Sequence, residues 1–266
     1  MENKTNFWNH IEELRKRLIL SIVFIAVGAT AGFYFAEDLL YGIEFPLRSR
    51  LHVSFHTPYV SLITVAKPLK LVYITPIEAI WTYLKLGLIA GLIITLPLVL
   101  YEIWLFIKPG LYPEERKYVR LFVIAGGIFF LIGGGFSFFI ILPFAIHFLL
   151  SIGAGNLVPM LSVGEYVDFC LQFMLSFGLI FELPFVLLIL VAMGIVSPDG
   201  LAEKRRYAIV GAFILGAILS PSPDVFNQTL VAVPLIVLYE IGILLSRMFI
   251  SRRQKEKGQK LPEKAE

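Results

Sequence analysis

The sequence predicts an all-α polytopic membrane protein with six transmembrane helices and both termini in the cytoplasm. Three observations support this fold class. Hydrophobic residues make up 58% of the 266 residues, and mean hydropathy is +0.80, whereas about half of a soluble domain is apolar. The apolar residues gather in six long stretches. Basic residues crowd into alternate gaps between those stretches, and such gaps face the cytoplasm because Lys and Arg resist translocation.

The basic gaps fix an orientation and divide the chain. Most of the 23 Lys and Arg residues lie in four segments, which are 1–17, 108–120, 203–206 and 247–266. An even number of spans returns the chain to its starting side, so both termini are expected inside. We expect residues 1–246 to form the six-helix membrane domain and residues 247–266 to form a basic, disordered cytoplasmic tail.

The first four apolar stretches are each long enough to cross a bilayer. A spanning helix needs about 20 apolar residues. The predicted spans are 18–36, 77–107, 119–150 and 166–193. Because the last three exceed this length, they have room to tilt, kink or protrude.

The last two apolar stretches are shorter. Span 5, residues 207–219, offers roughly 20 Å of helix at 1.5 Å per residue, and span 6 covers about 229–246. The turn between them, 220–224, contains two prolines. Spans 5 and 6 therefore predict a short hairpin that does not cross the full thickness of the bilayer. The alternative is two slightly short helices whose snorkelling end residues make up the difference.

Prolines within the spans predict bent helices. Four spans carry one each, namely Pro97, Pro143, Pro184 and Pro234. Proline removes a backbone donor and bends a helix, and neighbouring helices can satisfy the freed carbonyl in a membrane. Four bent helices predict a bundle with a concave face.

Several function classes find no support in the sequence. No basic patch with interleaved aromatic residues suggests nucleic-acid binding. The histidines and acids show no metal-ligand spacing, and no serine hydrolase, zinc protease or phosphate-binding glycine motif occurs. We therefore expect neither enzymatic activity nor a cofactor or metal.

Glu182 is the candidate functional residue within the membrane. It lies in an apolar run about eleven residues from the end of span 4, beside Pro184. An ionisable residue near mid-membrane is costly and is a functional hypothesis by default. The alternative is a structural hydrogen bond between helices. Lys85 is expected to reach toward the outer surface. Acids near the ends of spans, such as Glu102, Asp168 and Glu240, lie at the membrane interface, where a charged side chain costs little free energy.

The cytoplasmic face carries acids beside bases at two places. Residues 10–17 are expected to form an amphipathic helix along the inner interface, in which Glu12 and Glu13 precede three basic residues. In the first cytoplasmic loop, Glu114 and Glu115 precede Arg116. Local ion pairs are the simpler interpretation. Two acidic points on one face could instead receive a cationic peptide.

Longer stretches resemble the TatC family, the central membrane subunit of the twin-arginine (Sec-independent) protein translocase. The resemblance covers all six spans. It rests on residues 10–17 (HIEELRKR), 101–116 (YEIWLFIKPGLYPEER), 177–184 (FGLIFELP), 194–198 (GIVSP) and 223–229 (PDVFNQT). The first outer loop, around 49–71, is longer than the family pattern, and Glu12 replaces a residue that is more commonly apolar.

The resemblance implies a function and a site. Members are receptors for signal peptides with two consecutive arginines, and they export folded proteins with the proton-motive force. It assigns the peptide site to Glu13, Glu115, Arg15, Arg17 and Phe106. Other matched residues are Glu182 in the membrane and Pro46, Asp224 and Gln228.

The resemblance also implies partners and a location. Spans 5 and 6 correspond to the helices that contact the single-span proteins TatA or TatB, and further TatC copies are expected in the complex. The location implied is the cytoplasmic (inner) membrane. The competing hypothesis from the residues is a proton-coupled transporter of a small solute, which Glu182 and bent helices would suit.

Overall fold

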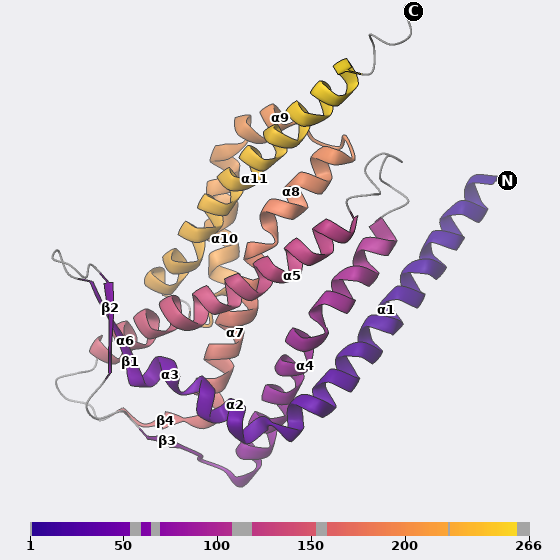
Figure 1. Cartoon of the computed structure of the whole chain (residues 1–266). Helices are drawn as coiled ribbons and strands as arrows, with labels where there is room; N and C mark the ends of the chain where they lie inside the picture. Colours follow the sequence, from indigo (N-terminus) through magenta and orange to yellow (C-terminus); the bar gives the residue numbers. More distant parts are fainter. Residues whose placement is uncertain are drawn as a thin grey trace, which may run out of the picture.

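The computed structural model describes residues 2–53, 60–64, 70–107, 119–152, 159–222 and 224–259. It is a bundle of long helices with short strands at one end (Figure 1). Figure 1 shows the start of α1 and the end of α11 toward the opposite end of the bundle. We call these two ends the strand end and the N/C end.

The elements follow one another as helices interrupted by short strands. In chain order they are α1 (Glu2–Tyr34), α2 (Ala36–Ile43), α3 (Phe45–Arg48), β1 (Ser49–Val53), β2 (Val60–Thr64), β3 (Leu71–Val72), α4 (Pro76–Ile107), α5 (Val119–Phe136), a π-helical turn (Ser137–Ile141), α6 (Leu142–Ile152), β4 (Leu161–Ser162), α7 (Val163–Phe181), α8 (Leu183–Ala192), α9 (Pro198–Glu203), α10 (Arg205–Leu219) and α11 (Val225–Gln259).

The predicted all-α polytopic fold is confirmed. Within the described residues, five helical segments are long and apolar enough to cross a membrane: 11–34, 76–107, 123–152, 163–192 and 225–251. The sixth apolar helix, α10, has 15 residues. Many large apolar side chains on these helices remain exposed in the isolated chain, as expected for surfaces that contact lipid.

Three expectations about helix ends are wrong. The segment 10–17 is not a separate interfacial helix, because α1 runs unbroken for 33 residues and Figure 1 shows it as one rod. Span 6 is not short, because α11 runs unbroken for 35 residues. The segment from Arg247 to Gln259, expected to be disordered, is helical. Lys, Arg, Glu and Gln are good helix formers, so helix propensity continues after the apolar pattern stops.

The hairpin of α10 and α11 does not reach the strand end. The carbonyl of Leu219, at the end of α10, accepts hydrogen bonds from Ser176 Oγ at 3.2 Å and Gln172 Nε2 at 3.5 Å. Both donors lie on α7, about 14–20 Å along that helix from Val163 at 1.5 Å per residue. The short α10 therefore ends well inside the bundle.

Prolines act differently in each helix. α7 and α8 are separate helices that meet at Glu182, followed by Pro184 in the first turn of α8. The π-helical turn ends two residues before Pro143, consistent with local rewinding where a proline cannot donate. Pro97 and Pro234 lie within helices that continue past them.

Sequence analysis missed the strands. β1 and β2 pair antiparallel, with Ser49 opposite Thr64 and Val53 opposite Val60. β3 and β4 form a short parallel pair, with Leu71 opposite Leu161. The first pair lies in the long outer loop, which is rich in β-branched residues. The second ties the segment before α4 to the segment before α7.

The core is centred on α7. Val167, Cys170, Phe173 and Phe177 are fully buried along one side of this helix, at the three- and four-residue spacing of a helix face. Residues of α6 and α11 close around them. α7 is therefore the central element against which the site-bearing helices are placed.

Candidate functional site

Glycines bring α1 and α4 into close contact and set their register. A Cβ on Gly91 would lie 2.1 Å from the backbone nitrogen of Ala29, and a Cβ on Gly32 would lie 2.5 Å from the carbonyl oxygen of Gly87. Only glycine permits backbones to approach this closely. The antiparallel register that pairs these glycines continues toward the N/C end.

In this register an ion-pair cluster forms at the N/C end. Arg17 Nη1 lies 2.8 Å from Glu102 Oε2, and Arg17 Nη2 lies 3.5 Å from Glu13 Oε1. The Glu102 side chain is 9% exposed, whereas that of Glu13 is 37% exposed. The same register places Phe106 of α4 at the level of Glu13. One guanidinium thus joins a buried carboxylate to an accessible one.

The structure brings some predicted site residues together and leaves others apart. Glu13 and Arg17 are in contact, and Phe106 is partly buried nearby. Arg15 is exposed on α1, and residues two apart on a helix do not face each other. Glu115 lies outside the described residues, in the segment between α4 and α5.

Sequence reasoning missed Glu102. It regarded this acid as inexpensive near a span end, yet the carboxylate is buried and is the closer partner of Arg17. The two residues are 85 positions apart in the sequence, so local residue spacing does not predict the pair. The available signal was a carboxylate inside an apolar stretch, which implies a cationic partner.

Glu182 lies at the junction of α7 and α8. A Cβ on Gly126 of α5 would be 3.1 Å from Glu182 Oε2, so the carboxyl group packs directly on a glycine of α5. Its Oε1 atom is buried and has no hydrogen-bond partner among the described residues. A buried polar atom without a partner is costly, so the junction holds an acceptor with unused capacity.

Between α10 and α11, the family-matched polar residues fix the hairpin turn. Asp224 Oδ1 accepts a hydrogen bond from the backbone nitrogen of Asn227 at 2.8 Å, as the N-terminal cap of α11. Its Oδ2 accepts from Ser222 Oγ and from Asn227 Nδ2. Gln228 donates to the carbonyl oxygen of Phe213 at 2.8 Å, which joins α11 to α10. These contacts are structural.

Pro46 belongs to the buried surface of α3 near the strand end. The hydroxyl of Tyr166 donates to the carbonyl oxygen of Ile43 at 2.8 Å, which ties α7 to the turn before α3. A proline here limits the conformations of the connection. Pro46 therefore supports the packing of the outer segment.

Two further polar contacts connect α4 to α7. Lys85 Nζ lies 2.7 Å from both carboxylate oxygens of Asp168, so Lys85 is paired within the protein instead of reaching outward alone. Glu78 accepts hydrogen bonds from the backbone nitrogens of Gly164 and Ile74, each at 2.8 Å, and from the Ser162 hydroxyl. These contacts hold the strand end together.

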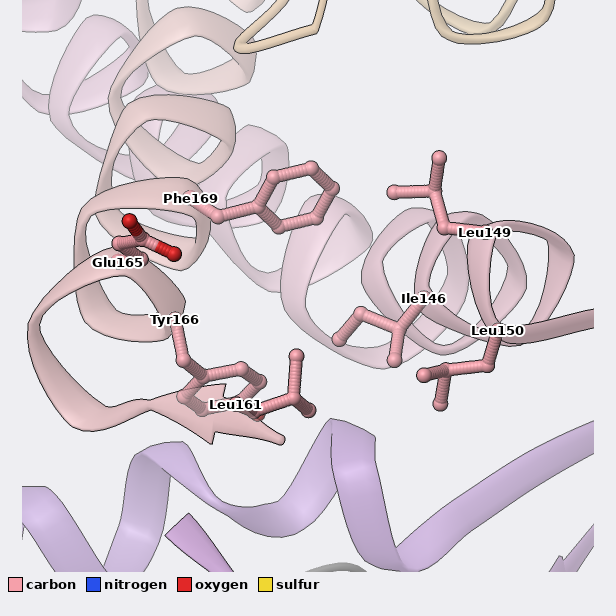
Figure 2. A pocket seen from close by; sticks show the side chains of 7 residues that line it. All are labelled: Ile146, Leu149, Leu150, Leu161, Glu165, Tyr166 and Phe169. Atoms are coloured by element: carbon pink, nitrogen blue, oxygen red, sulfur yellow. The ribbon is translucent and has the colours of Figure 1, made fainter. Parts of the chain in front are cut away.

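A hollow of 200 Å³ lies between α6 and the start of α7. Figure 2 shows its lining, in which Ile146, Leu149 and Phe169 present apolar groups and Glu165 is the one acid. Ligand sites combine apolar walls with several convergent polar groups. This lining lacks such a set, so the hollow is packing space.

Among the described residues no group of three or more His, Cys, Asp or Glu side chains is placed to hold a metal ion. The polar groups that the fold does bring together are the guanidinium with its two carboxylates at the N/C end and the isolated Glu182. The first can exchange ionic partners. The second can accept or donate a hydrogen bond inside the bundle.

Comparison with known proteins identifies the family. Residues 9–234 match the family model described as Sec-independent protein translocase protein (TatC). The chain is 37% identical over 248 residues to TatC of Carboxydothermus hydrogenoformans, covering 93% of this chain and 95% of that protein. It is 38% identical over 249 residues to TatC of Aquifex aeolicus, covering 93% and 96%.

A solved structure agrees with the sequence relatives. The crystal structure of a twin-arginine translocase receptor, TatC, superposes with a TM-score of 0.74 at 36% identity, covering 90% of this chain and 98% of that one. The matches extend over nearly the whole length of both partners, and the identity exceeds the level at which only a fold is shared. This chain therefore belongs to the TatC family of Sec-independent protein translocase proteins.

Proposed function

We propose that this chain is the receptor subunit of a twin-arginine translocase. It binds signal peptides with two consecutive arginines at the N/C end, and together with single-span partners of the TatA or TatB type it exports folded proteins. Family membership supports the proposal, as does the likeness to a crystal structure whose protein is described as a twin-arginine translocase receptor.

The observation that carries the proposal is the geometry around Arg17. Its guanidinium lies between two carboxylates, close to the buried Glu102 and farther from the accessible Glu13. A peptide arginine that takes Glu13 leaves Arg17 neutralised by Glu102. Peptide binding therefore leaves no buried charge without a partner. An unpaired buried charge would cost several kcal/mol.

Arginine specificity follows from the same chemistry. A guanidinium binds a carboxylate through two parallel N–H donors, a geometry that an ammonium group cannot reproduce. We assign the second arginine of the peptide to Glu115, by family match. Arg15 and Phe106 belong to the surrounding surface, where Phe106 offers an apolar contact.

Membrane partners belong to the interior and to the hairpin. Glu182 offers a polar atom without a described partner at the junction of α7 and α8, which suits a hydrogen bond to a signal peptide or to a partner helix. The exposed apolar side of α10 suits a single-span helix. The proton-motive force is the proposed energy source, in accord with the absence of a nucleotide-binding motif from the sequence.

The proposed topology places the N/C end in the cytoplasm of a bacterial inner membrane, with six crossings. Basic residues concentrate in the segments at that end, as the positive-inside rule requires. With this orientation the Glu13 surface faces newly synthesised cargo, and the strand end faces outward.

Binding of a synthetic Arg-Arg signal peptide tests the proposal. Glu13→Gln or Glu115→Gln should weaken binding roughly ten- to a hundredfold, because loss of a charged hydrogen bond costs about 1.5–3 kcal/mol. Affinity is measured on purified protein in detergent at moderate salt, against a Lys-Lys peptide as the ligand control.

Glu12→Gln is the matched control. Glu12 is the exposed neighbour of Glu13 on the same helix turn and undergoes the same change of charge. It should leave affinity within about twofold. Unchanged affinity in both test variants, or an equal loss in the control, would contradict the receptor assignment.

A further inference from the structure

A groove of 620 Å³ lies along α11 at the N/C end, beside the first residue of α10. The lining of this groove contains neither Glu182 nor the residues proposed to bind the Arg-Arg peptide. It is lined by Arg205, Ile236, Val237, Glu240, Ile241, Ile243, Leu244, Arg247 and Met248. An apolar wall and a charged mouth together suit an amphiphilic ligand.

The groove lies beyond the close backbone contact of the α10–α11 hairpin. Near the hairpin turn the two helices touch closely: a Cβ on Gly216 would lie 2.7 Å from the carbonyl oxygen of Gln228, and Ala212 and Ala232 are buried there. Toward the N/C end the contact is made by long side chains, Arg205 of α10 and Glu240 of α11. The groove lies along this part of α11.

The wall of the groove is apolar and accessible. Val237, Ile241, Leu244 and Met248 share one face of α11 at three- and four-residue spacing, and they are 54%, 38%, 59% and 49% exposed. They belong to the segment 225–251, which is apolar enough to span a membrane. This wall is therefore placed at the depth of lipid acyl chains.

The volume favours a slender occupant. The lined stretch of α11 is about 18 Å long, and a helix of 10 Å diameter and that length would occupy about 1,400 Å³. The groove holds 620 Å³, which lies in the range of small-ligand pockets, about 300–1,000 Å³. An acyl chain fits such a space better than a whole helix does.

The mouth presents two half-exposed guanidinium groups. Arg205 donates from Nε and Nη2 to the two oxygens of Glu240, both at 2.7 Å. Its Nη1 has no acceptor among the described residues. Arg247 contacts Asp199 through Nη2 alone, at 3.1 Å. Both arginines retain donors for an anion.

The surrounding sequence is basic on the same side. Lys204 and Arg206 flank Arg205 and are exposed. α11 continues past Arg247 to Gln259, and the sequence of that extension contains Arg252, Arg253, Lys255 and Lys257. Clusters of four to eight Lys and Arg residues next to a transmembrane helix are typical of anionic-lipid binding.

We propose that this groove is a binding site for an anionic phospholipid. The phosphate lies between Arg205 and Arg247, and one acyl chain lies along Val237, Ile241 and Leu244. The basic extension of α11 strengthens the attraction without defining the site. The proposal does not depend on the receptor function, because it concerns a different surface.

Titration of delipidated protein with phosphatidylglycerol, followed by native mass spectrometry, tests the site. Phosphatidylcholine with the same acyl chains is the uncharged comparison. Arg205→Gln and Arg247→Gln should each weaken phosphatidylglycerol binding about five- to tenfold, since each removes one cation next to the phosphate. Arg206→Gln is the matched control, because Arg206 is an exposed neighbour that does not line the groove; it should change affinity less than twofold.

Two further variants separate binding from damage to the fold. Glu240→Gln removes the acid that competes for Arg205, so phosphatidylglycerol should bind more tightly, whereas a misfolded groove would bind less. Leu244→Trp fills the wall and should abolish phosphatidylglycerol binding without changing charge. Melting temperatures measured without lipid monitor the fold.

Three results would overturn the proposal. An equal loss of phosphatidylglycerol affinity in Arg206→Gln and Arg205→Gln would show that the lipid is attracted by surface charge in general and not by the groove. Equal affinity for phosphatidylcholine would show that no anion site exists. Protein extracted from its native membrane that retains a single-span peptide in the groove, with no phospholipid, would assign the groove to a protein partner.

Discussion

Glu182 shows what a single residue reveals at the sequence level. An isolated carboxyl group in an apolar run stands out without any structure, and its position beside Pro184 predicts a bend. The structure breaks the helix at this residue and leaves Oε1 buried without a described partner. Its contact with Gly126 could not be predicted, because it joins helices distant in sequence.

Substitution of Glu182 separates a transport role from a structural one. Glu182→Gln should retain partial transport because it keeps hydrogen-bonding ability, whereas Glu182→Ala should transport less. Neither should weaken Arg-Arg peptide binding at the N/C end by more than about twofold. Transport into membrane vesicles and melting temperature are measured on the same preparations.

The structural alternative gives the opposite pattern. If Glu182 only joins helices, the alanine variant will melt at a lower temperature and yet transport normally per folded molecule. That combination would show that the residue has no direct part in transport.

The Arg17 contacts mark the limit of residue-level prediction. Glu13 and Arg17 share a helix face, so their proximity follows from four-residue spacing. The contact of Arg17 with Glu102 depends on how α1 and α4 pack. The sequence does not show which glycines of the two helices lie against each other, so this contact could not be predicted. Local spacing thus predicts half of the ion-pair cluster, and helix packing supplies the rest.

At the scale of elements, α1 and α4 depend on their glycine contact. Gly91→Ala places a Cβ 2.1 Å from a backbone nitrogen of α1, so the helices must separate. Overpacking of this kind costs about 1–3 kcal/mol. We expect a lower melting temperature and, because Arg17 shifts relative to Glu102, weaker Arg-Arg peptide binding.

Gly135→Ala is the control for this prediction. A Cβ at Gly135 would meet no atom within 4 Å, and alanine favours helix by up to about 1 kcal/mol over glycine. Its melting temperature should stay unchanged or rise. Equal destabilisation by both substitutions would contradict the role assigned to the α1–α4 contact.

The sequence predicts the presence of the long helices in this protein better than it predicts where they begin and end. Apolar length identifies spans 2, 3 and 4 within a few residues of the apolar helical segments, whereas the segment of span 1 begins seven residues before its predicted start. It misplaces the end of span 6, because a polar helix leaving the membrane has no apolar pattern. The β1–β2 pair joins strands that are close in sequence, and its β-branched residues were the signal that sequence analysis did not use.

For the whole molecule, the positive-inside pattern predicts which sites are accessible from outside. Single cysteines are introduced into a Cys170→Ala background and treated with a membrane-impermeant maleimide in intact cells. A cysteine at Asn156 should be labelled rapidly, and one at Asp224 more slowly because the hairpin turn is recessed. Cysteines at Glu114 and Lys204 should be labelled only after the cells are opened.

Labelling of Glu114 in intact cells would contradict the six-span topology. Permeabilised cells serve as the control for reactivity at every position. Basic residues in the gaps are sufficient to predict this topology, because the rule depends on charge and not on fold. The shape of the assembled bundle depends on contacts between helices, and the sequence alone does not predict these contacts.

The recessed hairpin also has a consequence for the membrane around the protein. α10 supplies about 22 Å of helix against a hydrocarbon thickness of about 30 Å. This hydrophobic mismatch requires the adjacent lipids to shorten or tilt, at a fraction of a kcal/mol for each ångström. We therefore expect the bilayer to be locally thinner beside α10. Under the proposed function, a cargo that crosses next to this helix would meet a thinner barrier than it would elsewhere.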